Sequence, residues 1–180
     1  MYAGDIQMDA QPLLRRLAPA EAHAAASALA EVLLDCVAGG ASVSFMADLT
    51  RADAEAFWRA QASAEDGRTI LVAEDDLGVC GVVQVIPAWP PNQPHRADVS
   101  KLLVHRRGRR RGLAEALMSA AEDAARQMAR TVLVLDTVTG GDAERLYARL
   151  GWTKVGVIPD FALMPDGALC ATTVFTKALA

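Results

Sequence analysis

The fold of this chain is decided by the stretch Asp98-Val-Ser-Lys-Leu-Leu-Val104, His105-Arg-Arg-Gly-Arg-Arg-Arg-Gly-Leu-Ala114, Glu115-Ala-Leu-Met118. A β-branched and apolar run comes first, a turn rich in glycine and arginine comes second, and an amphipathic helix comes third. The helix is predicted from apolar residues that recur every three or four positions: Leu113, Leu117, Ala121, Ala124 and Met128.

A strand, a glycine turn and a helix N-terminus, in this order, form a general phosphate-binding arrangement. The N–H groups of the turn and of the first helical turn converge on one point, where the helix dipole favours negative charge. Gly112 has no Cβ and lets a phosphate approach the backbone, and Ala114 is the next smallest choice. Arg109, Arg110 and Arg111 add positive charge. We therefore predict a phosphate site here and call residues 105–114 the phosphate turn.

The same turn has two other interpretations, a basic surface loop and a nucleic-acid-binding patch. The net charge of −4 and the pI of about 5.3 disfavour the second, because nucleic-acid-binding domains usually carry excess positive charge. Neither G-x-x-x-x-G-K-[ST] nor G-x-G-x-x-G occurs around these glycines. A cationic turn in an acidic chain suits a small anionic ligand, and we expect no nucleic acid as partner.

The composition is that of one folded domain spanning residues 1–180. Hydrophobic residues make up 52% of the chain and charged residues 22%, which is typical of globular proteins. The cysteines Cys36, Cys80 and Cys170 show neither C-x-x-C nor zinc spacing, and the histidines do not cluster with carboxylates. We therefore expect a reduced, cytoplasmic protein without a metal. The first residues do not resemble a signal peptide, and charges interrupt the alanine-rich segment 17–37, so no membrane partner is expected.

Apolar periodicity and turn residues predict the remaining elements. We expect strands at residues 11–17, 69–75, 79–86, 95–104, 131–137, 153–158 and 169–177. Helices are expected at 19–37, 51–64, 113–129 and 143–150, and loops at 39–49, 88–94 and 159–167. The strand 131–137 is almost continuously apolar, as expected of a parallel strand that is buried on both faces.

Two motifs resemble one protein family. The pattern Arg109-x-x-Gly112-x-Ala114 resembles the Q/R-x-x-G-x-G/A signature of the GCN5-related N-acetyltransferases (GNAT). A second segment, Ala143-Glu-Arg-Leu-Tyr147-Ala-Arg-Leu-Gly151-Trp152, is similar to the family's A-x-x-x-Y-x-x-L-G-F. The resemblance covers nearly the whole chain. It implies an α/β fold with a mixed, twisted sheet, about four flanking helices and splayed central parallel strands.

The resemblance also implies acetyl-coenzyme A (acetyl-CoA) as cosubstrate. Its pantetheine arm would lie between strands 99–104 and 131–137, and a bulge would aim a free N–H near Leu103 or Val104 at the acetyl oxygen. The implied cofactor-binding residues are Leu102, Leu103, Val104, Arg109, Arg110, Arg111, Gly112, Leu113, Ala114 and Ala143. Arg106 and Arg110 stand where the family often has proline and glycine, and their side chains are expected to point to solvent. Alanine at 143 replaces the usual Asn or Ser.

Catalysis requires an acid for the leaving thiolate and a base for the amine. The resemblance implies that Tyr147 is the general acid, whereas without the motif it would be interpreted as a core tyrosine. Asp98 and Asp136 stand at opposite ends of neighbouring predicted parallel strands and are the candidate bases, acting directly or through water. The alternative for both is a solvated strand-end carboxylate.

The predicted loops 39–49 and 159–167 are similar to those of the tabtoxin-resistance branch of the family, as are residues 101–104 and 135–137. We expect these loops to bind a small polar amine, amino-acid- or dipeptide-like, or a tabtoxin-type β-lactam amine. The residues concerned are Ser42, Phe45, Asp48 and Phe161. A non-catalytic acyl-CoA sensor is the alternative function, and a homodimer is the alternative to a monomer.

Overall fold

The computed structural model describes residues 12–179, so the expectation about a signal peptide concerns residues outside the described part of the chain. One seven-stranded sheet has the order β1-β2-β3-β4-β5-β7-β6. Its strands are β1 (Leu13–Leu17), β2 (Thr69–Asp75), β3 (Gly78–Pro87), β4 (Arg96–Val104), β5 (Val132–Val138), β6 (Thr153–Leu163) and β7 (Leu169–Ala178). The predicted mixed α/β architecture is confirmed.

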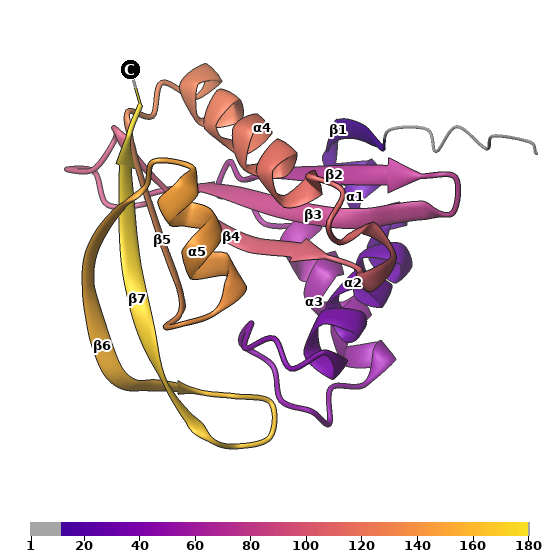
Figure 1. Ribbon diagram of the computed structural model, residues 1–180. Coiled ribbons are helices and arrows are strands. Elements are labelled where there is room, and N and C mark those ends of the chain that lie inside the picture. Colours follow the sequence, from indigo (N-terminus) through magenta and orange to yellow (C-terminus); the bar gives the residue numbers. More distant parts are fainter. Residues whose placement is uncertain (1–11, 180) are drawn as a thin grey trace, which may run out of the picture.

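The sheet consists of two antiparallel parts that meet at one parallel junction. Strands β1 to β4 form the first part, and β5, β7 and β6 form the second. At the junction β4 pairs with β5 over three residues only, the last being Asp98 opposite Val134. Beyond this pair the two strands diverge, as Figure 1 shows. The splayed central strands implied by the family resemblance are therefore present.

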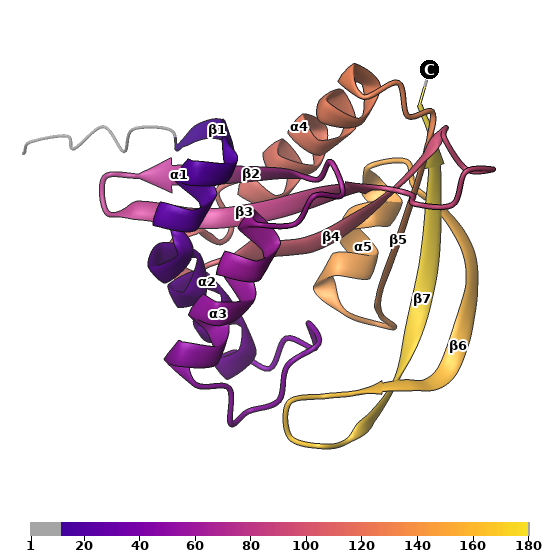
Figure 2. The same cartoon turned by 180° about the vertical axis from the view of Figure 1, so that it is seen from behind.

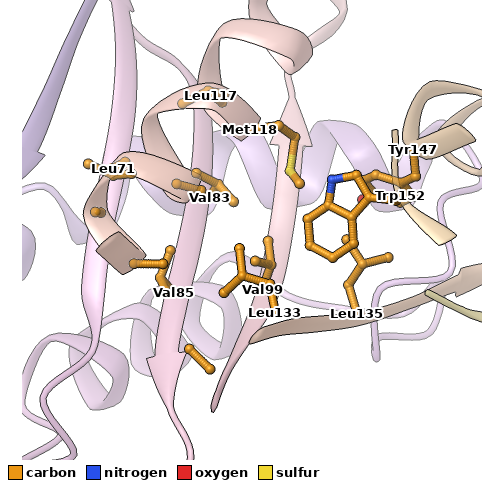
Figure 3. Close-up of a cluster of buried hydrophobic side chains, with 14 of the residues drawn as sticks. Leu71, Val83, Val85, Val99, Leu117, Met118, Leu133, Leu135, Tyr147 and Trp152 are labelled. Carbon is orange, nitrogen blue, oxygen red and sulfur yellow. The ribbon is translucent and has the colours of Figure 1, made fainter. Parts of the chain in front are cut away.

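Helices cover both faces of the sheet (Figures 1 and 2). One face carries α1 (Pro19–Ala24), α2 (Ala26–Ala38) and α3 (Arg51–Ala62), and the other carries α4 (Leu113–Gln127) and α5 (Asp142–Arg149). The apolar stripe of α4 fixes its orientation, because Leu117 and Met118 pack onto sheet residues such as Val83 and Val99 (Figure 3). A second core lies under α1 to α3.

Three expectations about secondary structure were wrong in detail. The helix expected at 19–37 is divided at Ala25, whose ψ of 1° leaves the helical region, so residues 12–179 contain five α-helices. Strand β6 continues to Leu163 and takes up most of the expected loop 159–167. Proline is tolerated there because β6 is an edge strand, and a register shift between Ile158 and Ala162 accommodates it. The expectation that strand 131–137 is buried on both faces was also wrong, because in β5 only Leu133 and Leu135 are buried.

Candidate active site

A cavity of about 1460 Å³ lies where β4 and β5 diverge. It is larger than most small-molecule pockets, which measure roughly 300–1,000 Å³. It brings together most of the predicted site residues: Ser42, Phe45, Asp98, Leu102, Leu103, Val104, Arg109, Arg110, Gly112, Leu113, Ala114, Asp136, Ala143, Tyr147 and Phe161. Asp48 and Arg111 are exposed and lie outside its lining.

The phosphate turn has the backbone geometry of an anion-binding site. Gly112 is the N-cap of α4 with φ of 77°, and a Cβ at this position would meet no atom within 4 Å. The first N–H groups of α4, from Leu113 onward, have no partner within the helix and border the cavity. Arg110, where the family often has glycine, is exposed as expected but adopts φ of 61°. Such a left-handed conformation costs about 1–2 kcal/mol.

A buried carboxylate on α2, which the sequence analysis missed, stabilises the phosphate turn through hydrogen bonds and ion pairs. Asp35 of α2 accepts hydrogen bonds from the backbone N–H of Arg106 (2.8 Å) and from its guanidinium. The nearest guanidinium nitrogen of Arg109 lies 3.6 Å from the same carboxylate, and His105 Nε2 lies 3.7 Å away. Burial opposes ionisation, but the Arg106 hydrogen bonds prevail and hold the pKa of Asp35 below its usual value. The sequence contained one signal for this role, because Asp35 is a carboxylate within the otherwise apolar run of α2.

Arg109 also makes contacts within the protein that the sequence analysis did not anticipate. Its Nε donates to the carbonyl oxygen of Val104 at 3.1 Å, and its other end faces Asp35. The side chain ties the end of β4 to the phosphate turn. It supplies positive charge near the cavity while it is held by groups of the protein.

The predicted bulge in β4 is present, slightly before the expected position. Leu103 pairs with Val82 and Ser100 pairs with Gln84, so two residues of β4 oppose one of β3. Lys101, one of the two, has φ of 52°. Because β5 leaves β4 after Asp98, the backbone of residues 102–104 borders the cavity.

Tyr147 lines the cavity from α5 while most of its ring is buried. The ring centre lies 6.0 Å from that of Trp152 and 5.8 Å from that of Phe175, and Figure 3 shows Tyr147 beside Trp152. Burial, and next the negative charge of Asp136, raise the pKa of the phenol. The hydroxyl therefore stays protonated at neutral pH, and the raised pKa also makes it a weaker acid than an exposed tyrosine.

The two candidate bases differ in their partners. Asp98 forms an ion pair with the guanidinium of Arg96 on the same strand. Asp136 is exposed and accepts a hydrogen bond of 3.2 Å from the hydroxyl of Thr172. Its charge also raises the pKa of Tyr147 and opposes the lowering of the Lys101 pKa. Asp136 is therefore the carboxylate with the more available charge.

The acceptor mouth, as we call loop 39–49 together with the β6–β7 hairpin tip, borders the cavity. Ser42 Oγ donates to the carbonyl of Leu163 at 2.8 Å, and the N–H of Ala47 donates to Pro165 at 3.1 Å. The loop and the hairpin lie side by side in both views (Figures 1 and 2). Lys101, which the sequence analysis did not single out, donates to Ser44 Oγ at 3.1 Å in this region.

Within residues 12–179, no helix has both the length and the apolar character needed to cross a membrane. The same residues contain no grouping of three or more His, Cys, Asp or Glu side chains that could hold a metal ion.

Solved acetyltransferase structures resemble this fold. A GCN5-related N-acetyltransferase from Kribbella flavida is 23% identical with a TM-score of 0.75, over 94% of this chain and 98% of that one. A ribosomal-protein-alanine N-acetyltransferase from Brucella melitensis is 22% identical with a TM-score of 0.75, over 93% and 99%. A phosphinothricin acetyltransferase from Sinorhizobium meliloti, in complex with acetyl-CoA, is 17% identical with a TM-score of 0.77, over 95% and 90%.

At these identities the likeness shows the fold, and the expected GNAT architecture is confirmed. The family is shown by a sequence model described as the acetyltransferase (GNAT) family, which matches residues 27–152, more than half of the chain. The matched region includes the phosphate turn, the diverging strands and Tyr147. This chain therefore belongs to the GNAT family of acetyltransferases.

Proposed function

We propose that this protein transfers an acetyl group from acetyl-CoA to the primary amine of a small polar acceptor, amino-acid- or dipeptide-like. One observation carries the proposal: the phosphate turn, the free edge of β4, Tyr147 and Asp136 line one cavity. Each part of acetyl transfer thus has a suitable group within the same space. The acetyl-CoA complex of the Sinorhizobium meliloti protein supports the choice of donor.

The residues of the cofactor end fit a bound pyrophosphate and a chain of amides. N–H groups at the start of α4, from Leu113 and Ala114, would donate to phosphate oxygens, while Arg110 adds charge at the rim. The open edge of β4 at Leu102, Leu103 and Val104 can receive an extended, amide-containing arm as an added strand. When bound, acetyl-CoA supplies the thioester acetyl group. Ala143 has no hydrogen-bonding side chain and would contribute contact only.

Proton movement would be divided between two groups. Asp136, directly or through water, would take the proton of the acceptor amine, with Asp98 as the second candidate. Tyr147, whose hydroxyl is protonated at neutral pH, would donate a proton to the leaving thiolate. A backbone N–H at the β4 bulge would polarise the acetyl carbonyl, and positioning of both reactants would supply much of the acceleration.

The acceptor would enter through the acceptor mouth. Ser42 and Phe45 contribute from loop 39–49, and Phe161 contributes from β6. Asp48 is exposed near this loop and would act at the entrance by attracting a cationic amine. We propose tabtoxin, or its β-lactam part, as the specific acceptor, because loop 39–49 resembles the tabtoxin-resistance branch. The setting of the reaction would be the cytoplasm.

We also propose a homodimer formed through β6. This strand lies at the edge of the sheet and exposes Val155, Val157 and Ile158 together with Phe161. Exposed apolar edge strands are disfavoured in monomers because they offer a template for pairing. Light scattering after size-exclusion chromatography measures the mass, and Val157→Lys is expected to yield monomers. A monomeric parent protein would contradict this assembly.

The experiment that tests the proposed function is an acceptor screen with acetyl-CoA. Release of free thiol is measured with amino acids, dipeptides, polyamines, tabtoxin-like β-lactam amines, phosphinothricin and a histone-type peptide. Turnover is expected with one or more of the small acceptors. Efficient turnover of the peptide alone would refute the proposed acceptor class. Acetyl-CoA binding without turnover of any amine would favour the non-catalytic sensor.

A further inference from the structure

Lys101 lines the cavity at the β4 bulge and carries an ammonium group. Its ammonium donates to Ser44 Oγ at 3.1 Å and lies 5.8 Å from the centre of the Phe57 ring. Both contacts hold the side chain at the acceptor mouth. The nitrogen is thereby placed beside Ser44 of loop 39–49, on the acceptor side of the cavity.

The backbone at both ends of this hydrogen bond is unusual. Lys101 has φ of 52° and Ser44 has φ of 77°, and neither residue is a glycine. Each left-handed residue costs roughly 1–2 kcal/mol, a cost that proteins retain mainly where the surroundings or the function require it. Two such residues, 57 positions apart, meet at the same wall of the cavity. The bulge therefore orients the side chain of Lys101 in addition to interrupting the pairing of β4 with β3.

The charges around Lys101 leave room for an anion. Within residues 12–179, no carboxylate forms an ion pair with its ammonium, which is hydrogen-bonded to a neutral hydroxyl. Burial lowers the pKa of Lys101, and the more distant Asp136 opposes this effect. A partly buried cation without an ion-pair partner is costly, and an anionic ligand group would relieve that cost.

The cavity thus offers opposite charges to the two ends of a small molecule. Lys101 stands at one side, and the Asp136 carboxylate stands on β5 across the diverging strands. The other cationic lining residues are Arg109 and Arg110 in the phosphate turn and Arg149 on α5. A zwitterion could place its amine toward Asp136, where the acetyl group must arrive, and its anionic group on Lys101.

We propose that Lys101 determines acceptor specificity by binding an oxyanion, in the first place the carboxylate, of an amino-acid-type acceptor. The proposal rests on the proposed acetyltransferase function and adds the residue that selects a zwitterionic amine over a simple amine. A carboxylate and a phosphorus oxyanion share the recognised chemistry, namely short acceptors of charge-assisted hydrogen bonds.

The test compares matched acceptors in parent and variant enzymes. The acceptors are the best amino acid of the screen, its carboxamide, and an aminoalkylphosphonate that carries a phosphorus oxyanion but no carboxylate. The variants are Lys101→Met, which keeps the length and removes the charge, and Lys101→Arg, which keeps the charge. Steady-state kcat and KM are measured for each pair, and calorimetry with acetyl-CoA verifies that each variant retains a folded cofactor site.

The parent enzyme is expected to prefer the amino acid to its carboxamide. Lys101→Met should lower kcat/KM for the amino acid by roughly 10- to 100-fold, mainly through KM. The loss for the carboxamide should be at least about tenfold smaller, and Lys101→Arg should retain most of the preference. Lys101-dependent turnover of the phosphonate would identify a phosphorus oxyanion as the second source of the recognised group, and its absence would restrict recognition to carboxylates.

Two results would overturn the inference while the acetyltransferase function stands. The first is a parent enzyme that accepts the carboxamide as well as the amino acid. The second is an equal loss for both acceptors in Lys101→Met, which would make Lys101 a support for the acceptor mouth. Failure of the parent enzyme to acetylate any amine would overturn the proposed function itself and this inference with it.

Discussion

The phosphate turn and the acceptor mouth both line one cavity and are built differently. The turn comes from one continuous stretch, and it is braced from behind by the buried Asp35. The mouth joins segments that are distant in sequence, and its Ser42–Leu163 hydrogen bond spans 121 positions. Its side chains are largely exposed, including Met46 and Phe161.

The difference follows from the ligand that each of the two segments would bind. A cofactor phosphate has a fixed shape and charge, so backbone N–H groups and a helix N-terminus can bind it with little help from side chains. An acceptor differs from enzyme to enzyme, and its recognition depends on side chains at loop tips, which tolerate change more readily. We therefore expect substitutions in the turn to abolish cofactor binding, and those at the mouth to change which amine is used.

The largest effect is expected from a charge reversal at the phosphate turn. Gly112→Asp would direct a carboxylate at the bound pyrophosphate and should weaken acetyl-CoA binding by roughly 100-fold or more, equivalent to about 2.8 kcal/mol. Gly112→Asn is the matched control, because asparagine has the same shape and also tolerates positive φ. Calorimetry should show that the asparagine variant binds much better than the aspartate variant. Equal affinity of the aspartate variant and the parent would remove the phosphate assignment.

The next effect concerns Tyr147, the proposed general acid. Tyr147→Phe keeps the packing against Trp152 and Phe175 and removes only the hydroxyl. We expect kcat to fall by roughly 10²-fold, the lower end of the usual scale of general acid catalysis, with acetyl-CoA affinity retained. Steady-state kinetics and calorimetry measure the two quantities. Turnover at the parent rate would reduce Tyr147 to a packing residue.

The contribution of Asp35 to the phosphate turn should be measurable as a change in the free energy of unfolding. Asp35→Asn weakens the hydrogen bonds to Arg106 and should lower the free energy of unfolding by about 1–3 kcal/mol at neutral pH. The folded state depresses the pKa of Asp35, so this contribution is present above the ordinary pKa of about 3.9 and is lost as the pH falls through the lower pKa of the folded state. Urea titrations should show the difference between parent and variant narrowing below about pH 4.

A surface aspartate provides the control for this measurement. Asp123 on α4 is exposed and forms an ion pair with Arg126 one turn away. Asp123→Asn should change stability by no more than about 0.5 kcal/mol. If Asp35→Asn changes stability by as little as Asp123→Asn, the phosphate turn does not depend on Asp35.

A smaller effect is expected at the candidate bases. Asp136→Asn should lower turnover by roughly tenfold, and most at low pH, where the acceptor amine is largely protonated. Asp98→Asn should have a weaker effect of the same kind, because Asp98 is already paired with Arg96. The pH profiles of kcat/KM test the order of the two. No change in either variant would mean that the amine enters neutral or that water alone takes its proton.

The cofactor end was predictable from the sequence because its determinants are local. Strand β4, the left-handed Gly112 and the apolar stripe of α4 follow one another within a continuous segment, where periodicity and glycine chemistry are informative. The two predicted bases and Tyr147 lie in the same cavity as this turn. What could be read was the local geometry and its order along the chain.

The rest depended on partners that the sequence does not place. Asp35 reads as one charge on an alanine-rich helix until α2 packs against the phosphate turn. Lys101 reads as an ordinary strand lysine until the bulge turns it toward Ser44. Strand β6 extends through Pro159 because an edge strand does not need every N–H for pairing. Asp48 stays outside the cavity lining. Each of these outcomes depends on tertiary contacts.

The central claim is that the acetyl group passes directly from acetyl-CoA to the amine within this cavity. Cys36 and Cys170 also line it and would be the residues to carry a covalent acetyl group. Initial rates at varied acetyl-CoA and acceptor concentrations test the claim most directly. Direct transfer predicts double-reciprocal lines that intersect, and intact mass spectrometry should show unmodified protein when the amine is omitted. Parallel lines, together with an acetylated enzyme that passes its acetyl group to the amine, would contradict it.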